Sequence, residues 1–250
     1  VVVDGSDNKI PECYINQQYY PPHKDEDACV KNDVTLDSFS VITGPNASGK
    51  TTFLKTTAIN IILAQQLGIG FFDSCMLRPY TDIHSYLNIP DTSGRDSLFQ
   101  AESRRCKEIL EKIQKNDGRQ FCIFDELYSG TNPKEATKSA YAFLEYLRNY
   151  NHVDLLLTTH YVSICDEWSE QDHIKKTIKN YKMIVEESQY RNIPTYKIEP
   201  GISRIEGAIN ILQDMDYPEE MIAMIQDKDK SDEDKSDEDN TVSTPNVVEV

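Results

Sequence analysis

The sequence predicts an α/β fold in which a central, mostly parallel sheet is flanked by helices. Two continuous apolar runs, at 121–124 and 155–157, are typical of strands buried on both faces, as in parallel sheets. Segments with helical periodicity lie between these strands, and such alternation favours strand–helix–strand units. A glycine-rich segment that joins a predicted strand to a predicted helix is the third observation.

The first half of the chain supplies one clear strand and two helices. A strand is expected within residues 34–43, and a helix runs from Thr51 to about Leu67. The stretch 68–92 is broken by glycine and proline and is expected to hold short strands. Apolar residues interleaved with charges predict an amphipathic helix over 97–115.

The second half continues the alternation and then changes character. A helix is expected over 132–147, between the two buried strands. The segments 181–185 and 196–198 are typical of a hairpin. Two short helices are expected at 207–212 and 218–225. We therefore expect the sheet to end in a hairpin, followed by a small helical segment.

The chain is strongly acidic, with a formal net charge of −16 over 250 residues. An acidic surface repels the phosphate backbone of nucleic acids. This argues against the segment being the main nucleic-acid-binding surface. Any contact with DNA is expected to come from other domains of a longer protein.

The cysteines and the hydropathy indicate the compartment. The six cysteines are scattered without a C-x-x-C pair, which favours neither a zinc site nor a disulfide framework. No apolar run approaches the roughly 18–20 residues of a membrane span. We expect a reducing, intracellular setting, without resolving nucleus, cytoplasm or viral factory, and no membrane partner.

Residues 44–51, Gly-Pro-Asn-Ala-Ser-Gly-Lys-Thr, match the pattern G-x-x-x-x-G-K-[ST] without a mismatch. Such a loop at a helix start aims backbone N–H groups and the positive end of the helix dipole at phosphate. Lys50 would reach the β- and γ-phosphates, and the Thr51 hydroxyl would bind Mg²⁺. The predicted nucleotide-binding residues are Gly44, Pro45, Asn46, Ala47, Ser48, Gly49, Lys50, Thr51 and Thr52. This P-loop predicts that the chain binds a nucleoside triphosphate, ATP, together with Mg²⁺.

Two acidic residues, Asp125 and Glu126, follow the buried strand at 121–124. Beside a P-loop, Asp125 can support Mg²⁺, and Glu126 can orient or deprotonate the attacking water. Without a P-loop the same pattern could be a strand that ends at solvent. The pairing with the intact motif favours catalysis, with Lys50 as a further catalytic residue.

His160 follows the strand at 155–157. A histidine at that point can hydrogen-bond the γ-phosphate or the attacking water, although a lone histidine is more often an exposed residue at a strand end. Ser97 begins the helix at 97–115, where an ordinary N-cap serine is the simplest interpretation.

The run from about Val30 to Met221 resembles the C-terminal ATPase domain of the MutS family of DNA mismatch-repair proteins, within the ABC ATPase class. The segments that carry the resemblance are 43–52, 97–102, 125–131, 159–161 and 200–220. The resemblance implies a P-loop NTPase of ABC/MutS type that hydrolyses ATP as a nucleotide-switched dimer and controls a DNA clamp located elsewhere. By the same resemblance, Ser97 would act in trans, on the γ-phosphate of the nucleotide held by a second ATPase subunit in a homo- or heterodimer.

Some residues depart from the family pattern. Tyr128, Ser129 and Gly130 stand where the family usually has Gly-Arg-Gly, and the segment 203–207 also differs. In these departures the sequence most resembles the MutS-like proteins of giant DNA viruses. The changes leave the expected ATP binding intact and put the usual signalling between subunits in question.

Four parts are expected along the chain. Residues 1–32 are polar and broken by prolines, and form an irregular lead-in from an upstream region. Residues 33–200 form the MutS-like ATPase domain, and 201–226 a helix-turn-helix that dimerises. Residues 227–250 contain the repeated pentapeptide Lys-Ser-Asp-Glu-Asp and predict a disordered acidic tail.

Two other functions fit parts of the sequence. One is an ABC-type ATPase of a chromosome-structuring or assembly protein, although no Leu-Ser-Gly-Gly-Gln signature is present. The other is an ATP-sensing dimerisation module with little turnover, which the altered residues Tyr128 and Ser129 favour slightly. The residues that contact the adenine stay open between Tyr196 and the stretch 20–23.

Overall fold

The computed structural model describes most of the chain. The described residues are 13–21, 29–87, 89, 97–171, 177–187, 192–205 and 207–225. Statements about the structure refer to these residues. The predicted acidic tail at 227–250 lies outside them.

A six-stranded sheet forms the centre of the fold, with the strand order β5-β6-β7-β3-β8-β9. Its strands are β3 (Phe39–Thr43), β5 (Asp82–Tyr86), β6 (Gln120–Asp125), β7 (Val153–Thr158), β8 (Ile178–Glu187) and β9 (Asn192–Pro200). All neighbours from β5 to β8 are parallel, and only β9 runs antiparallel to β8. The predictions of a mostly parallel sheet and of a terminal hairpin are confirmed.

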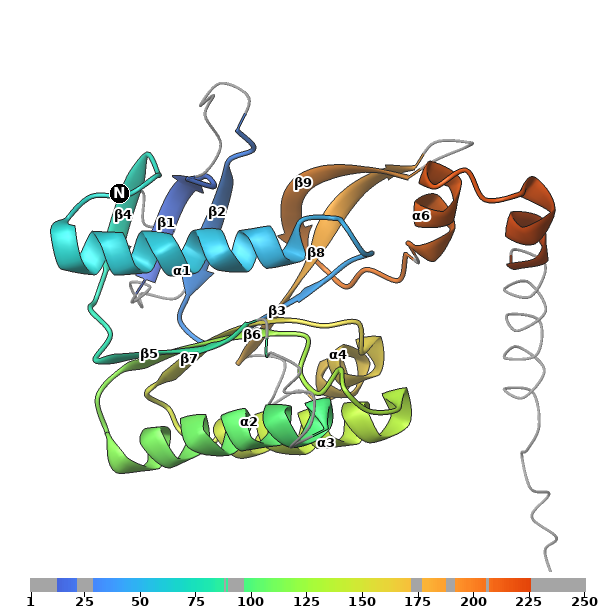
Figure 1. The fold of residues 1–250 in the computed structure, drawn as a ribbon. Helices are drawn as coiled ribbons and strands as arrows, with labels where there is room; N and C mark the ends of the chain where they lie inside the picture. The colour runs from blue at the N-terminus through green and yellow to red at the C-terminus, as the bar shows by residue number, and fades with distance from the viewer. Residues whose placement is uncertain are drawn as a thin grey trace, which may run out of the picture.

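Helices cover both faces of this sheet (Figure 1). Helix α1 (Lys50–Leu67) lies on one face, and α2 (Leu98–Lys115), α3 (Pro133–Leu147) and α4 (Val162–Ser169) lie on the other. Because successive side chains of a strand point to opposite faces, neighbouring strand residues enter different cores. Ile42 and Phe121 pack with α1, whereas Val41 and Phe124 pack with the opposite three helices. This double burial explains the continuous apolar runs in the sequence.

A second, three-stranded antiparallel sheet lies beyond α1, in the order β2-β1-β4. It consists of β1 (Cys13–Gln18), β2 (Asn32–Leu36) and β4 (Ser74–Leu77), so that α1 lies between the two sheets (Figure 1). The prediction that residues 1–32 are irregular is wrong for β1. Cys13 and Ile15 are fully buried in the core that contains α1, whereas Tyr14 between them points to the other face of the strand and is half-buried.

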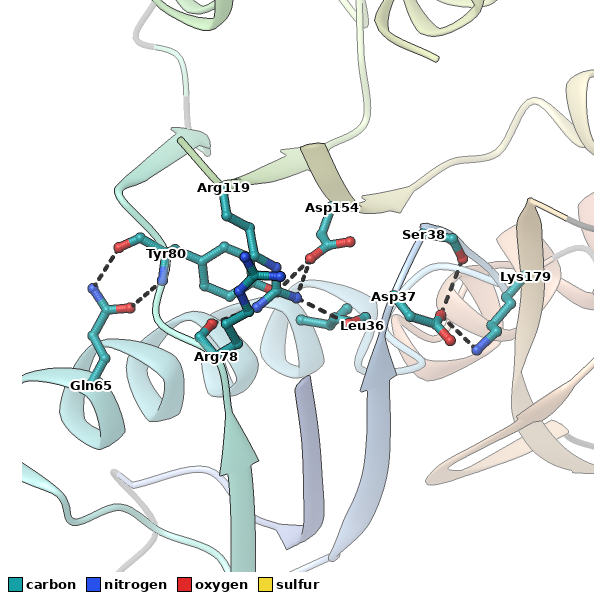
Figure 2. A network of polar contacts seen from close by, with 9 residues as sticks. All are labelled: Leu36, Asp37, Ser38, Gln65, Arg78, Tyr80, Arg119, Asp154 and Lys179. Atoms are coloured by element: carbon teal, nitrogen blue, oxygen red, sulfur yellow. Dashed lines mark hydrogen bonds and ion pairs between the residues drawn. The ribbon is translucent and has the colours of Figure 1, made fainter. Parts of the chain in front are cut away.

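A buried polar network closes the amino ends of β6 and β7 (Figure 2). Arg119 and the Tyr80 hydroxyl both donate to Asp154, at 2.5 and 2.9 Å, and the Arg119 guanidinium lies 4.1 Å from the centre of the Tyr80 ring. Gln65 of α1 exchanges hydrogen bonds with the Tyr80 backbone. The network ties the β4–β5 connection to the large sheet and to α1, at the end of the sheet away from the loop after β3.

The last described residues are helical. Helix α6 (Ala208–Asp214) follows β9, and residues 219–225 form a further short helix. Among the residues with described structure, no helix combines the length and the apolar character that crossing a membrane demands.

Candidate functional site

The loop between β3 and α1 follows a path that requires glycine. Gly49 has a φ of 101°, in the left-handed region that other residues rarely adopt. A Cβ atom at Gly49 would lie 2.9 Å from Cδ1 of Tyr196, and one at Gly44 would lie 2.9 Å from Cβ of Met183. The two glycines of the motif therefore allow the loop to curl beneath the β8–β9 hairpin.

The amino end of α1 has no side-chain cap. Its N-cap residue is Gly49, and the first turn carries no acidic residue. In contrast, α2 and α3 are capped by the side chains of Ser97 and Asn132. The Ser48 hydroxyl, which is 1% exposed, also lacks a hydrogen-bond partner. An uncapped helix start beside an unpaired hydroxyl suits a phosphate group, because the first-turn N–H groups need an acceptor.

Lys50 lies within this loop. Its ammonium group donates to the carbonyl oxygens of Gly44 at 2.9 Å and Pro45 at 3.1 Å. Burial lowers the pKa of Lys50, and the nearby Glu126 and Asp125 oppose that shift. The side chain therefore forms a cationic centre inside the loop, facing two carboxylates.

Asp125, at the end of β6, bridges the end of β7 and the start of α1. Its Oδ2 accepts from the Thr51 hydroxyl at 2.9 Å, and its Oδ1 accepts from the Thr158 hydroxyl at 2.5 Å. The register explains this, since Asp125 pairs with Thr158 across β6 and β7, and β7 neighbours β3. A hydroxyl and a carboxylate are the hard oxygen ligands that Mg²⁺ prefers. Across the described parts of the chain no three His, Cys, Asp or Glu side chains are grouped to hold a metal, so a Mg²⁺ ion here would need ligands from phosphate and water.

Glu126 and His160 form a contact at the mouth of the loop. His160 Nε2 lies 2.8 Å from Glu126 Oε1 and 3.3 Å from Lys50 Nζ. The shorter contact favours the tautomer in which Nε2 carries the hydrogen and donates to Glu126, because a lone pair on Nε2 would repel the carboxylate. This hydrogen bond lowers the pKa of Glu126, and the Lys50 charge lowers it further.

The structure brings most of the predicted site residues together. A cavity of about 280 Å³ is lined by residues 46–52, Glu126 and Tyr196. Ser97 lies apart from this cavity lining. It caps α2 through a reciprocal pair of hydrogen bonds with Gln100, at 2.9 and 3.3 Å, so a role for Ser97 in trans stays a prediction.

A larger cavity of about 410 Å³ adjoins the loop. It shares Gly49, Thr52 and Tyr196 with the first cavity. Its other lining residues come from the ends of β1 and β2, from the segments beside those ends and from α1, and are Gln18, Tyr19, Tyr20, Cys29, Val30, Asn32, Phe53 and Thr56. The sequence alone does not decide whether Tyr196 or the stretch 20–23 contacts the base, and Tyr196 and Tyr20 both line this cavity.

Two residues of the site escaped sequence reasoning. Thr158 lies at the end of β7 directly opposite Asp125, and a hydroxyl residue at that strand end was the available signal. Gln18 lies at the end of β1, a strand that sequence reasoning missed, so no signal pointed to its place in the cavity.

Comparison with known proteins places the chain among characterised families. The family described as MutS domain V matches residues 40–231. The chain is 31% identical over 195 residues to Endonuclease MutS2 of Lactococcus lactis subsp. cremoris (strain MG1363), covering 78% of this chain and 24% of that protein. It is 31% identical over 202 residues to the DNA mismatch repair protein MutS of Staphylococcus epidermidis (strain ATCC 12228), covering 79% of this chain and 22% of that protein. The chain therefore spans about a quarter of the length of the curated relatives that it matches.

Proposed function

Because the chain belongs to the MutS family, we propose that it is the ATP-binding and ATP-hydrolysing module of a MutS-like DNA mismatch-repair protein. The fold would be a P-loop NTPase of ABC/MutS type. Two such modules would act as a nucleotide-switched dimer that controls a DNA clamp located elsewhere in the protein. The matched segments cover only 24% and 22% of the two relatives, and in this proposal DNA recognition would belong to parts outside the matched segment.

One observation carries the proposal. The uncapped start of α1 and the carboxylates of Asp125 and Glu126 converge at the carboxyl ends of β3 and β6, with Thr51 and Asp125 joined at 2.9 Å. In open α/β sheets, ligands bind beyond the carboxyl ends of the strands. A triphosphate in the loop would meet N–H groups, the Lys50 ammonium group and the Glu126 carboxylate within one small cavity, with Asp125 hydrogen-bonded to the Thr51 hydroxyl of its wall.

Each residue has a distinct role in the proposed reaction. Lys50 and the loop N–H groups would stabilise the charge on the phosphates, and the Thr51 hydroxyl and Asp125 would hold Mg²⁺. The metal, when bound, would neutralise charge that develops on the phosphoryl oxygens. Glu126, kept ionised by His160, would accept a proton from the attacking water or orient it.

The dimer is part of the proposal. Ser97 would approach the nucleotide of a second subunit, and residues 201–226 would contribute to the contact between subunits. Met215, Tyr217 and Met224 are exposed apolar residues in this segment, which supports a surface that another chain covers. The net charge of −16 supports DNA contacts through other domains.

An ATP-sensing module with little turnover is the second candidate. Tyr128 and Ser129 follow the acidic pair after Leu127 and depart from the family pattern. If the loop after Glu126 no longer supports hydrolysis, the chain would bind ATP and dimerise without releasing phosphate.

The test compares the purified chain with two variants and one control. We expect Lys50→Ala to abolish tight binding of a fluorescent ATP analogue, because the loop loses its cation. We expect Glu126→Gln to bind normally and to lose at least about a hundredfold in single-turnover phosphate release. Lys107→Ala, at an exposed position of α2, is the matched control.

The outcomes separate the two candidates. ATP-dependent dimerisation, followed by light scattering, together with phosphate release that requires Glu126 supports the ATPase. Dimerisation without phosphate release favours the sensor. Unchanged ATP binding by Lys50→Ala would contradict both.

A further inference from the structure

We propose that Glu102 is a positioning residue that holds the catalytic carboxylate of Glu126 by anchoring its loop on helix α2. The inference rests on the proposed ATPase activity and adds a residue to its machinery. Glu102 lies one turn beyond the start of α2, the helix that Ser97 caps.

The Glu102 side chain is a buried acceptor for the loop after β6. The residue is 2% exposed. One carboxylate oxygen accepts from the backbone N–H and the hydroxyl of Ser129, at 3.0 and 2.8 Å, and the other accepts from the Gly130 N–H at 3.0 Å. A buried carboxylate must be satisfied by donors. Here two backbone N–H groups and one hydroxyl of the loop supply them, so the loop and the helix hold each other in place.

The loop also packs directly on the first turn of α2. A Cβ atom at Gly130 would come within 2.7 Å of the Leu98 side chain and of the Phe99 backbone nitrogen. The Tyr128 ring lies 5.6 Å from the Phe99 ring, centre to centre. Contacts this close leave the loop little freedom to move independently of the helix.

The backbone at the acidic pair needs such an anchor. Glu126 and Tyr128 have φ angles of 53° and 59°, in the left-handed region that costs free energy for residues other than glycine. On one side, the Glu126 N–H donates to the Thr158 carbonyl at 3.1 Å. On the other side, the Tyr128 N–H donates to the Tyr86 hydroxyl at 3.2 Å, and Glu102 holds the next two residues.

The position of Glu102 has a functional consequence. Its carboxylate holds the loop of its own subunit, while Ser97 at the start of the same helix is proposed to serve the nucleotide of the partner. A displacement of α2 on dimerisation would therefore reach Glu126 through Glu102. Glu102 is not among the residues that line the cavity at the loop, so we infer that its effect is on orientation.

The experiment measures turnover and binding separately in the full chain. In Glu102→Gln, the amide nitrogen replaces one acceptor oxygen and faces an N–H donor of the loop. We expect kcat for ATP hydrolysis to fall by about tenfold or more, because small misplacements of a catalytic group slow chemistry strongly. The Kd for ATP is expected to change less than about threefold, since the phosphate loop is intact. Glu111→Gln, at a half-exposed position of the same helix, is the control.

A second variant keeps the proposal testable if Glu102→Gln folds poorly. Ser129→Ala removes one of the three donors and leaves the carboxylate in place. We expect a smaller fall in kcat, with the Kd for ATP unchanged. In the double variant the two effects should not add, because both act through the same contact.

The outcomes distinguish this inference from the proposed function. Wild-type kcat in both Glu102→Gln and Ser129→Ala would overturn the role of Glu102 and leave the ATPase standing. Equal losses of ATP binding and turnover would also overturn it, since they indicate a general structural defect. A wild-type chain that binds ATP and never releases phosphate would contradict the proposed function and the positioning role together.

Discussion

Gln18 donates its side-chain amide to the Thr57 hydroxyl across 2.8 Å, and this contact fixes the direction of the Gln18 carbonyl oxygen. The Thr57 hydroxyl uses its only hydrogen on the carbonyl of Phe53, at 3.0 Å, so it can only accept from Gln18. The Gln18 Oε1 atom is buried and has no hydrogen-bond partner. It belongs to a side chain that lines the cavity beside the proposed phosphate loop.

This geometry predicts a preference for adenine over guanine. If a bound base displaced the side chains that cover the Gln18 oxygen, the exocyclic amine of adenine would donate to it, whereas guanine presents a carbonyl at the same ring position. We expect Gln18→Met, which keeps the length of the side chain, to weaken ATP binding by about tenfold, or ~1.4 kcal/mol, and to leave GTP binding nearly unchanged. Competition binding with both nucleotides measures the effect.

A control and a contrary result define this test. Gln114→Met, on the exposed side of α2, should leave both affinities unchanged. If Gln18→Met kept the full preference for ATP, the base would have to be recognised elsewhere in the cavity.

The pairing of His160 with Glu126 predicts a pH effect. The hydrogen bond from His160 lowers the pKa of Glu126, with Lys50 adding to the shift. The carboxylate therefore stays ionised below the usual pKa of glutamate, roughly 4.3. Folding lowers the pKa of Glu126, so the ionised carboxylate stabilises the folded state fully when the pH is above the pKa of the unfolded chain. This stabilisation is lost as the pH falls through the lower pKa of the folded chain.

Removal of the imidazole should reverse the shift. We expect His160→Gln to raise the pKa of Glu126 and to move the acidic limb of the ATPase pH profile to higher pH. NMR titration of the Glu126 carboxyl carbon measures the pKa even if the variant is inactive. His152→Gln, at the opposite end of β7, is the control. If the pKa of Glu126 were the same in His160→Gln as in the wild type, groups other than His160 would be the cause of the lowered pKa.

The buried strands made the large sheet predictable. Phe121 and Phe124 enter cores on opposite faces, so every position from 121 to 124 is apolar. The carboxyl ends of parallel strands lie at one edge of the sheet. The prediction of parallel strands therefore also predicts that Asp125 and His160 lie near the loop at Lys50. The hydrophobic pattern of the strands therefore predicts most of the geometry of the site.

The small sheet and the loop anchor could not be predicted in the same way. Strand β1 is buried on one face only, and its apolar residues Cys13 and Ile15 alternate with polar ones over just six positions. Helix α4 lacks a side-chain cap at Tyr161, so no start signal marked it. The role of Glu102 depends on tertiary packing, because its partners lie 27 and 28 residues away.

The network around Asp154 predicts a large effect on stability. Asp154 and Arg119 have side chains that are only 10% and 9% exposed, and each satisfies the other (Figure 2). Asp154→Ala would leave the Arg119 charge buried without its partner. We expect this to lower the free energy of unfolding by about 3 kcal/mol, measured by urea denaturation.

The second ion pair in Figure 2 provides the comparison. Lys179 contacts Asp37 at 2.7 Å, but the two side chains are 39% and 32% exposed. We expect Lys179→Ala to cost less than about 1 kcal/mol, because water screens the pair. If Asp154→Ala lowered the free energy of unfolding as little as Lys179→Ala does, Arg119 would have to find another partner when Asp154 is removed.

The left-handed backbone at Tyr128 predicts that a glycine variant is more stable than an alanine variant, which is the reverse of the usual order. The residue is 7% exposed and packs against Phe99 and Phe143, yet its φ is 59°. Both Tyr128→Ala and Tyr128→Gly lose the packing of the ring, which costs about 3 kcal/mol or more. Only alanine keeps a Cβ atom in the left-handed region, at a cost of about 1 kcal/mol. We therefore expect the glycine variant to be the more stable of the two by about 1 kcal/mol in urea denaturation.

Alanine and glycine substitutions at an ordinary position of a helix should show the opposite order of stability. Lys107 lies within α2, where alanine is favoured over glycine by about 1 kcal/mol, so Lys107→Ala should exceed Lys107→Gly in stability. An alanine variant of Tyr128 that matched or exceeded the glycine variant would mean that the loop relaxes out of its left-handed conformation once the ring is gone. In that case the aromatic contacts, and not the Glu102 anchor, would hold the backbone beside Glu126.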